Sequence, residues 1–293
     1  MINSLVQGVL LGGYYALIAS GLSFMFSVMR IINLAHGSLA VLAAYALFAL
    51  AQYAHIPPFA GLLIVLPAMA VIGFLLQRFV LDRSLRAGPL VPILATFGLA
   101  IVIDNLLFQQ FGANTRSLGN FIGSLSYDSF ELPGKLYVGV LSVYIFIAAI
   151  AVLGGLQLLL SFTPFGRAIR ATSEDPDTAG LVGIDARLIN AAAAAIALVT
   201  VGIAGAALGL KGTFDAYSGS AQLLFAFEAA VIGGAGSVWG TLLGGIVLAL
   251  AESIGATISP LGFLIAGHGT FLVVLFVRAW LAGGIANLFR RPT

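Results

Sequence analysis

Residues 5–29, LVQGVLLGGYYALIASGLSFMFSVM, form an apolar segment without one charged side chain. About 20 such residues in a helix cross the ~30 Å hydrocarbon core of a bilayer. A secretory signal would have Lys or Arg ahead of it and a shorter apolar stretch, whereas this segment has no preceding cation and is followed by more apolar segments. The stretch therefore predicts a retained transmembrane helix.

The rest of the chain has the same character. Of its 293 residues, 60% are hydrophobic and 8% are charged, and the mean hydropathy is +1.10, far above that of a water-soluble domain. The 13 basic residues are scattered along the edges of apolar segments, so we expect no nucleic-acid partner. The absence of cysteine excludes disulfides and thiolate metal sites. Further spans are predicted at Leu34–Tyr53, Phe59–Leu81, Leu90–Phe111, Leu136–Phe162 and Leu188–Leu210.

Basic residues predict the orientation of these spans, because short cytoplasmic loops are rich in Lys and Arg. Every second connection between spans, beginning with the one after the first span, is rich in arginine, and the connections between them hold fewer basic residues. The first connection is therefore predicted to be cytoplasmic and the N-terminus to lie outside. The cytoplasmic set is Arg30, Arg78, Arg83, Arg86, Arg167, Arg170 and Arg187, and the outer set is Arg116, Lys135 and Lys211.

The pattern becomes irregular after Lys211. Arg290 and Arg291 favour a cytoplasmic C-terminal end, which requires an odd number of further crossings after Lys211. The remaining apolar segments, however, look like two spans, the second of them Leu261–Leu281. Glycines interrupt Phe225–Ile254, so we expect two short helices or a re-entrant pair there, facing protein or water. The predicted fold is an all-α, polytopic transmembrane bundle of about eight or more spans, with residues 1–293 forming one domain.

Small residues recur every four positions in three segments. Such spacing lets helix backbones approach closely in a membrane. These faces are expected to pack either within this bundle or against a second membrane subunit. The positions are Gly8 and Gly12, Gly205 and Gly209, and Gly236, Gly240 and Gly244.

The longest polar interval on the inner side is TPFGRAIRATSEDPDTAGLVGIDARLIN, which starts at Thr163. Thr163 followed by Pro164 predicts a short surface helix. Asp175 is placed to cap a second helix of about two turns, and Gly183 to end it. This second helix is either an ordinary capped surface turn or an element that docks on another protein.

Polar residues within apolar spans are candidates for a transport pathway, because they are costly in lipid. Asn33 and His36 either line such a pathway or tie the start of their helix to neighbouring backbone near the interface. His268 is interpreted as a flexible interfacial residue, and no metal site is expected. The possible pathway residues are Asn33, His36, Asp104, Asn105 and Glu228, with Glu252 close to the same glycine-broken region.

Three motifs in this sequence are similar to one family. GVLLGGYYALIASGLSFMFSVMRIINLAHGSLAVLAAY, GRAIRATSEDPDTAGLVGID and FEAAVIGGAGSVWGTLLGGIVLALAES resemble the opening, the cytoplasmic coupling region and the glycine-rich late segment of branched-chain amino acid ABC-transporter permeases of the LivH type. Asn33, Ala35 and Gly37 match the family's Asn-Phe-Ala-x-Gly-like signature, which Leu34 and His36 vary.

The resemblance implies an importer permease for branched-chain or other small neutral amino acids in a bacterial inner membrane, with no cofactor and no enzyme activity of its own. It implies a second homologous permease, two cytoplasmic ATPase subunits, a periplasmic substrate-binding protein and surrounding lipid as partners. Its coupling helix would contain Glu174, Asp175, Asp177, Gly180, Leu181 and Gly183. The alternative is an ion-coupled carrier or channel for a small neutral solute such as urea or an amide.

Overall fold

The computed structural model describes residues 2–88, 90–132 and 136–281. Lys135, Arg290 and Arg291, which enter the orientation argument, lie outside these ranges. Within them, eight helices are long and apolar enough to cross a membrane, as predicted. These are α1 (Ile2–Met29), α2 (His36–Tyr53), α3 with its extension (Pro58–Ala87), α5 (Val91–Phe111), α6 (Val140–Phe162), α9 (Ala186–Lys211), α11 (Val238–Ala256) and α12 (Pro260–Leu281).

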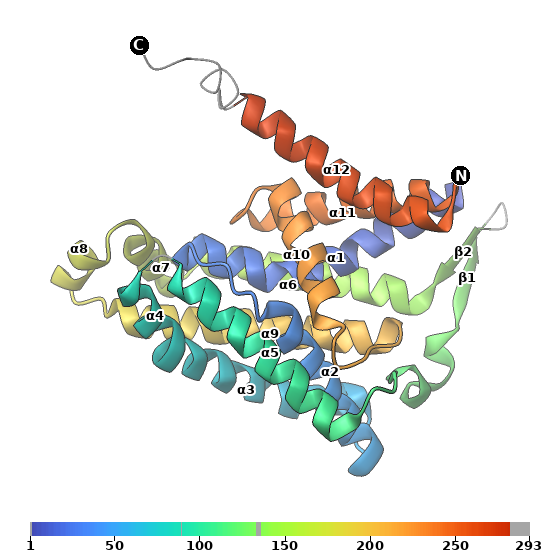
Figure 1. Ribbon diagram of the computed structural model, residues 1–293, viewed down its shortest axis with the longest axis horizontal. Helices are drawn as coiled ribbons and strands as arrows, with labels where there is room; N and C mark the ends of the chain where they lie inside the picture. The colour runs from blue at the N-terminus through green and yellow to red at the C-terminus, as the bar shows by residue number, and fades with distance from the viewer. Residues whose placement is uncertain (1, 89, 133–135, 282–293) are drawn as a thin grey trace.

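The shorter elements lie at the two ends of this bundle or inside it (Figure 1). The third span continues from α3 (Pro58–Leu76) through a π-helical turn, η1 (Gln77–Leu81), into α4 (Asp82–Ala87). α4, α7 (Pro164–Glu174) and α8 (Pro176–Leu181) lie at one end, where the predicted cytoplasmic arginines gather. The N-terminus and the hairpin of β1 (Ser129–Leu132) and β2 (Leu136–Gly139) lie at the opposite end.

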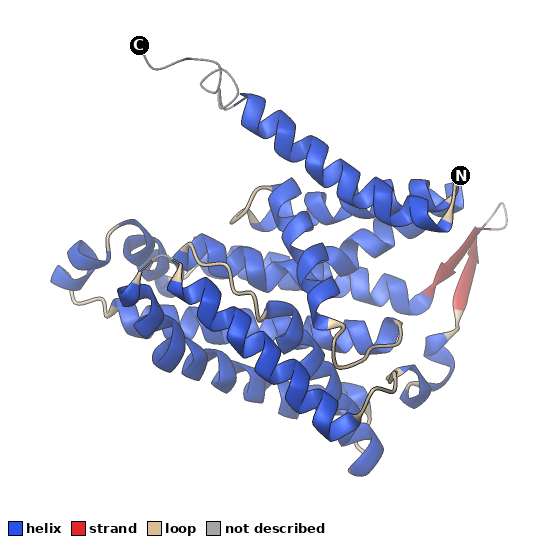
Figure 2. Ribbon diagram, viewed as in Figure 1, coloured by secondary structure: helices blue, strands red, loops and turns tan. Residues whose placement is uncertain are grey.

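The hairpin adds strands to a fold that was predicted to be helical throughout, and Figure 2 shows how small that addition is. It also corrects the start of the fifth span, which was expected at Leu136. Residues 136–139 pair with β1, so the helix begins at Val140. Two 3₁₀ turns, η2 (Gly119–Phe121) and η3 (Gly123–Ser126), precede the hairpin.

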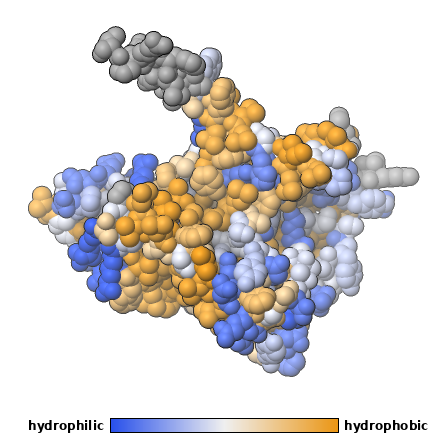
Figure 3. Space-filling view, in the orientation of Figure 1, coloured by the Kyte–Doolittle hydropathy of each residue, from blue (hydrophilic) through white to orange (hydrophobic). Residues whose placement is uncertain are grey.

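α1 and α9 form the centre of the bundle. α1 packs against α6, α9, α10 (Gly219–Gly233) and α11, and α9 packs against α2 and α3. Their buried residues are mostly small or aliphatic, so the helices approach closely. α3, α5, α6 and α12 expose apolar side chains. Broad hydrophobic areas cover the face of the molecule seen in Figure 3. This surface suits a lipid environment.

The segment after Lys211 forms three helices, of which α11 and α12 are long enough to span a membrane. α10 leads away from the hairpin end, α11 returns past Gly8, and α12 runs back until Arg278 reaches the end of α10. The break falls at residues 234–237, where Gly234 and Gly236 have φ values of +96° and +88°. α10 has only 15 residues and starts inside the bundle at Gly219, so it covers only part of the depth. Because Arg290 and Arg291 lie outside the described residues, the expected odd number of crossings stays a prediction. α11 is a full-length span, so the expected pair of short helices is wrong for its second member.

The entry into α2 is buried inside the bundle. Arg30 has a φ of +56°, which turns the chain back after α1, and residues 31–35 return without helical structure. His36 Nε2 donates to the Ile18 carbonyl oxygen at 2.7 Å. About 16 Å of helix separates Ile18 from the end of α1 at Met29, the end predicted to be cytoplasmic. α2 therefore starts near mid-depth.

Candidate functional site

The polar interval that starts at Thr163, which is predicted to be cytoplasmic, has the local structure that its sequence predicts. The Thr163 hydroxyl oxygen accepts from the Gly166 N–H at 3.0 Å and begins α7. The Asp175 carboxylate accepts from the Asp177 and Thr178 N–H groups and from the Thr178 hydroxyl, and begins α8. The Thr178 hydroxyl, followed by these N–H groups, lowers the pKa of Asp175 below its ordinary value. The carboxylate cap is therefore ionised at neutral pH.

α7 is fixed to the bundle, whereas α8 projects from it. Ile169 and Thr172 of α7 are buried, and the Arg170 guanidinium donates to the Leu160 carbonyl at the end of α6. On α8, Leu181 is 87% exposed and Val182, just after it, is 75% exposed. The chain turns at Gly183, where φ is +83°. A force applied to α8 can thus reach the spans through α7.

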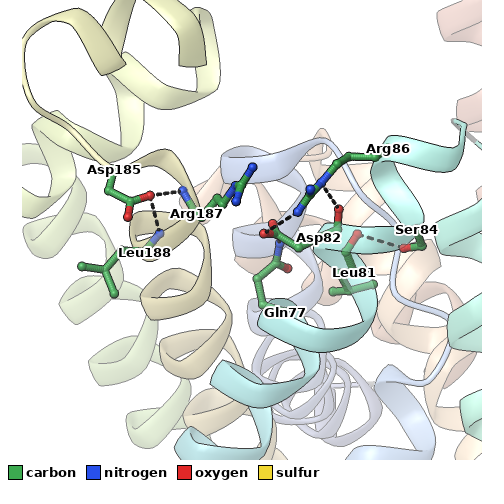
Figure 4. Close-up of polar contacts among 8 residues, drawn as sticks. All are labelled: Gln77, Leu81, Asp82, Ser84, Arg86, Asp185, Arg187 and Leu188. Atoms are coloured by element: carbon green, nitrogen blue, oxygen red, sulfur yellow. Dashed lines mark hydrogen bonds and ion pairs between the residues drawn. The ribbon is translucent and has the colours of Figure 1, made fainter.

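The surface beside this element is stabilised by a further helix cap and by one ion pair (Figure 4). Asp185 begins α9 by accepting from the Arg187 N–H at 2.9 Å. On the neighbouring α4, Arg86 lies 3.8 Å from the Asp82 carboxylate, and the buried Gln77 donates to the same carboxylate at 3.4 Å. Figure 4 shows Arg187 extending toward Asp82 and Arg86. The start of α9, which follows α8, therefore faces a polar surface on α4.

Asn33 and His36 bind backbone, but deep in the bundle rather than near the interface as one alternative expected. The Asn33 Oδ1 accepts from the Ala35 N–H at 3.0 Å, and both side chains are 0% exposed. Thr96 of α5 accepts from the Leu34 N–H at 3.1 Å, which satisfies the non-helical backbone at this depth. Asn33 Nδ2 and His36 Nδ1 have no partner within the described residues.

Asp104 and Asn105 point to different surroundings although they are adjacent on α5. Asp104 lies beside the Ser38 hydroxyl at the start of α2, and its Oδ1 is buried without a partner among the described residues. Asn105 is exposed and donates to the Ile101 carbonyl of its own helix at 2.7 Å. The Asn105 amide is thus already bonded within its own helix, whereas the Asp104 carboxylate has an oxygen without a described partner.

Glu228 lies in a second, separate polar cluster. Its Oε1 lies 2.6 Å from His268 Nδ1, so His268 is a paired residue of α12, and its interpretation as a flexible interfacial residue is wrong. The Tyr15 hydroxyl donates to Glu252 Oε2 at 2.6 Å in the same region. Glu228 and Glu252 are 2% and 0% exposed. This cluster joins α1, α10, α11 and α12.

The cluster includes residues that the sequence did not single out. The Tyr14 hydroxyl donates to Gln222 Oε1 at 2.9 Å, and the Lys211 ammonium lies 4.8 Å from the centre of the Tyr14 ring. Two adjacent tyrosines in an otherwise apolar span were an available signal, since a buried tyrosine hydroxyl usually has a partner. Their partners lie more than 200 residues away in the chain.

The recurring glycines lie against backbone of other helices of this chain. A Cβ at Gly12 would lie 2.4 Å from Ile246 Cα, and one at Gly205 would lie 2.2 Å from the Ala40 carbonyl oxygen. Gly240 and Gly244 are similarly close to the backbone of α10, with Cβ positions 2.2 Å from the Gly233 oxygen and 2.0 Å from the Ala229 oxygen. Gly8 and Gly209 are less tightly placed, since their nearest neighbours are side-chain atoms at 3.0 Å and 2.7 Å. Gly236 is the exception to the predicted helical stripe, because it lies in the turn before α11 and not on a helix.

Comparison with known proteins gives a consistent family. The family described as branched-chain amino acid transport system / permease component matches residues 4–279. The permease protein BraD of Pseudomonas aeruginosa is 29% identical, with 94% of each chain covered. LivH of Escherichia coli K12 is 26% identical over 86% of this chain and 85% of its own, and a probable LivH of Methanocaldococcus jannaschii is 28% identical over 91% and 86%.

No solved structure gives a significant match to the chain. The family match covers nearly all of the described residues, including the α2 entry, the α7–α8 element and the α10–α11 break. The chain is thus a multi-pass membrane protein that belongs to the branched-chain amino acid transport system permease family.

Proposed function

We propose that this chain is a permease subunit of an ATP-driven importer in a bacterial inner membrane, and that it passes branched-chain or other small neutral amino acids inward. The relatives named BraD and LivH are described as permease proteins of high-affinity branched-chain amino acid transport systems. The proposed assembly contains a second homologous permease, two cytoplasmic ATPase subunits and a periplasmic substrate-binding protein. ATP is bound by the ATPase subunits, and no cofactor is proposed for this chain.

The observation that carries the proposal is the projecting α8 with its exposed Leu181 and Val182. A large apolar side chain held in water favours contact with a protein groove. The fixed α7 connects α8 to the ends of α6 and α9, so movement of an ATPase subunit would move these spans. The coupling role of Glu174, Asp175, Asp177, Gly180, Leu181 and Gly183 is part of this proposal.

Gly180→Trp tests the docking step. Within the described residues nothing lies within 4 Å of a Cβ at Gly180, so the substitution leaves this fold intact while obstructing a partner. We expect the complex to hydrolyse ATP without amino acid uptake, or to lose its ATPase subunits. Gly155→Trp on the exposed side of α6 is the matched control, since its Cβ position is equally open. Normal coupled uptake in Gly180→Trp would refute docking at α8.

Mass spectrometry of proteins that co-purify with the tagged chain in mild detergent tests the assembly. Two ATPases and a second permease are the expected result. Recovery of the chain alone would instead favour the ion-coupled carrier or channel, for which the buried carboxylates Glu228 and Glu252 are the supporting observation. In that case uptake would follow an ion gradient without ATP, and Glu252→Gln would reduce it.

A further inference from the structure

Two helices begin beside each other at mid-depth in this bundle. A Cβ at Gly37, in the first turn of α2, would lie 1.8 Å from the Gly219 carbonyl oxygen at the start of α10. A Cβ at Gly219 would lie 2.7 Å from the Ser38 nitrogen. We call this contact of Gly37, Ser38, Gly219 and Ser220 the α2–α10 junction. Only glycine permits so close an approach.

Both helix starts at the junction are electrically incomplete. In the described ranges no side chain caps the start of α2 or α10. α3, α5 and α6 also start without such a cap, whereas α7, α8, α9 and α11 have one. The first N–H groups of a helix lack intrahelical partners and carry partial positive charge. Two uncapped starts inside a membrane protein therefore favour an anionic group at the junction.

Buried polar atoms without partners adjoin the same junction. Asn33 is 0% exposed, its Oδ1 is held at the start of α2, and its Nδ2 donor is unused by any described residue. On the α5 side, Asp104 lies beside Ser38 with a buried carboxylate oxygen that also lacks a described partner. The junction thus has donors for an anion and a carboxylate for a cation, which matches the two charges of an amino acid.

An apolar groove of about 480 Å³ adjoins these polar groups. It is lined by Ile32, Leu34, Ile93, Ser220, Leu223, Leu224 and Phe227. Ser220 belongs to both the groove and the junction, and Ile32 and Leu34 flank Asn33. The volume lies within the range of small-molecule sites, and the lining suits an aliphatic side chain. The groove is open at the surface of the chain.

We propose that the α2–α10 junction and this groove form a subsite for an aliphatic amino acid in transit. The substrate carboxylate binds at the two helix starts beside Asn33, its ammonium group binds Asp104, and its side chain lies in the groove against Leu223 and Leu224. This inference rests on the proposed function, because it assigns where that importer contacts its substrate.

The test uses the complete complex in proteoliposomes with its binding protein, radiolabelled L-leucine or L-alanine, and ATP. Asp104→Asn is expected to reduce leucine uptake at least tenfold while the complex still assembles, and Asp104→Glu to restore part of it. Asp128→Asn is the matched control, because Asp128 lies outside the spans and bonds Ser124. Unchanged uptake in Asp104→Asn would overturn the assignment of the ammonium site.

The groove is tested by selectivity, which a purely structural defect would not change. Leu224→Trp fills the groove, so we expect leucine uptake to fall at least fivefold more than alanine uptake. Leu63→Trp on α3 is the control, since Leu63 is 80% exposed away from the groove. Equal losses for both amino acids would overturn the groove assignment. Failure of the wild-type complex to assemble or transport would instead refute the proposed function itself.

Discussion

Gly12→Ala should separate α1 from α11, against which Gly12 is closely packed. A Cβ at this position would lie 2.4 Å from Ile246 Cα and 2.8 Å from Ile246 N on α11. Carbon atoms in favourable contact are about 3.5–4.0 Å apart, so α1 and α11 would have to move apart by about 1 Å. Both close atoms are backbone, and a rotamer change cannot relieve the overlap.

The cost follows from overpacking, which typically destabilises by about 1–3 kcal/mol. Alanine also stabilises a helix interior by about 0.5–1 kcal/mol relative to glycine, and this effect opposes the overpacking. Gly154→Ala on α6 makes the same chemical change, but nothing among the described residues lies within 4 Å of its Cβ position. The helix gain is common to both variants, so their difference of about 1–3 kcal/mol isolates the α1–α11 contact.

Thermal denaturation in one detergent, followed by fluorescence-detected gel filtration, measures that difference. Each kcal/mol corresponds to about 2–4 °C, so Gly12→Ala should melt about 2–12 °C below Gly154→Ala. Both variants need the same heating rate, because unfolding in detergent is often irreversible. Equal melting temperatures, or a higher one for Gly12→Ala, would refute the close approach of α1 and α11.

Three further outcomes are expected. Tyr15→Phe removes the donor to the buried Glu252 and should destabilise the protein by about 1–3 kcal/mol, seen as a lower melting temperature. Asp175 has a lowered pKa, because the Thr178 hydroxyl binds its carboxylate, so its capping contribution is complete above its ordinary pKa and is lost only as pH falls through the lowered value. ATP-coupled uptake in Asp175→Ala should be impaired equally at pH 6 and pH 8. Arg278→Met removes a donor to the last turn of α10 and should increase hydrogen exchange there.

Each of these has a result that contradicts it. Tyr144→Phe, at a 56% exposed tyrosine of α6, is the control for the loss of a hydroxyl group. If it lowers the melting temperature as much as Tyr15→Phe does, the bond from Tyr15 to Glu252 does not stabilise the protein. A defect in Asp175→Ala that appears at only one of the two pH values would contradict the capping argument. Unchanged exchange in α10 would show that its last turn does not depend on Arg278.

Local chemistry explains which features the sequence could predict. The caps at Thr163 and Asp175 and the turn at Gly183 involve residues only a few positions apart, and the structure shows all three. The first six spans follow from the length of their apolar segments, to within a few residues at their ends. The hairpin before α6 was missed because its residues 136–138 are as apolar or aromatic as a span.

The candidate site depends on contacts that no local pattern contains. Gly37 and Gly219 are ordinary glycines in the sequence, and the contact between them creates the α2–α10 junction. His268 has no ligand or charge partner nearby in the chain, yet Glu228 lies beside it in space.

The sequence by itself determined that this chain is a multi-pass helical membrane protein, which end carries the arginines, and which family it resembles. Hydrophobic length, charge placement and short motifs are properties of consecutive residues, and the membrane selects for them directly. Only the tertiary structure decided that α2 begins at mid-depth, that α10 meets it there, and that Asp104 of α5 lies beside Ser38 of α2. Helix association in lipid depends on close backbone packing between distant segments, so these positions are fixed only when the whole bundle is assembled.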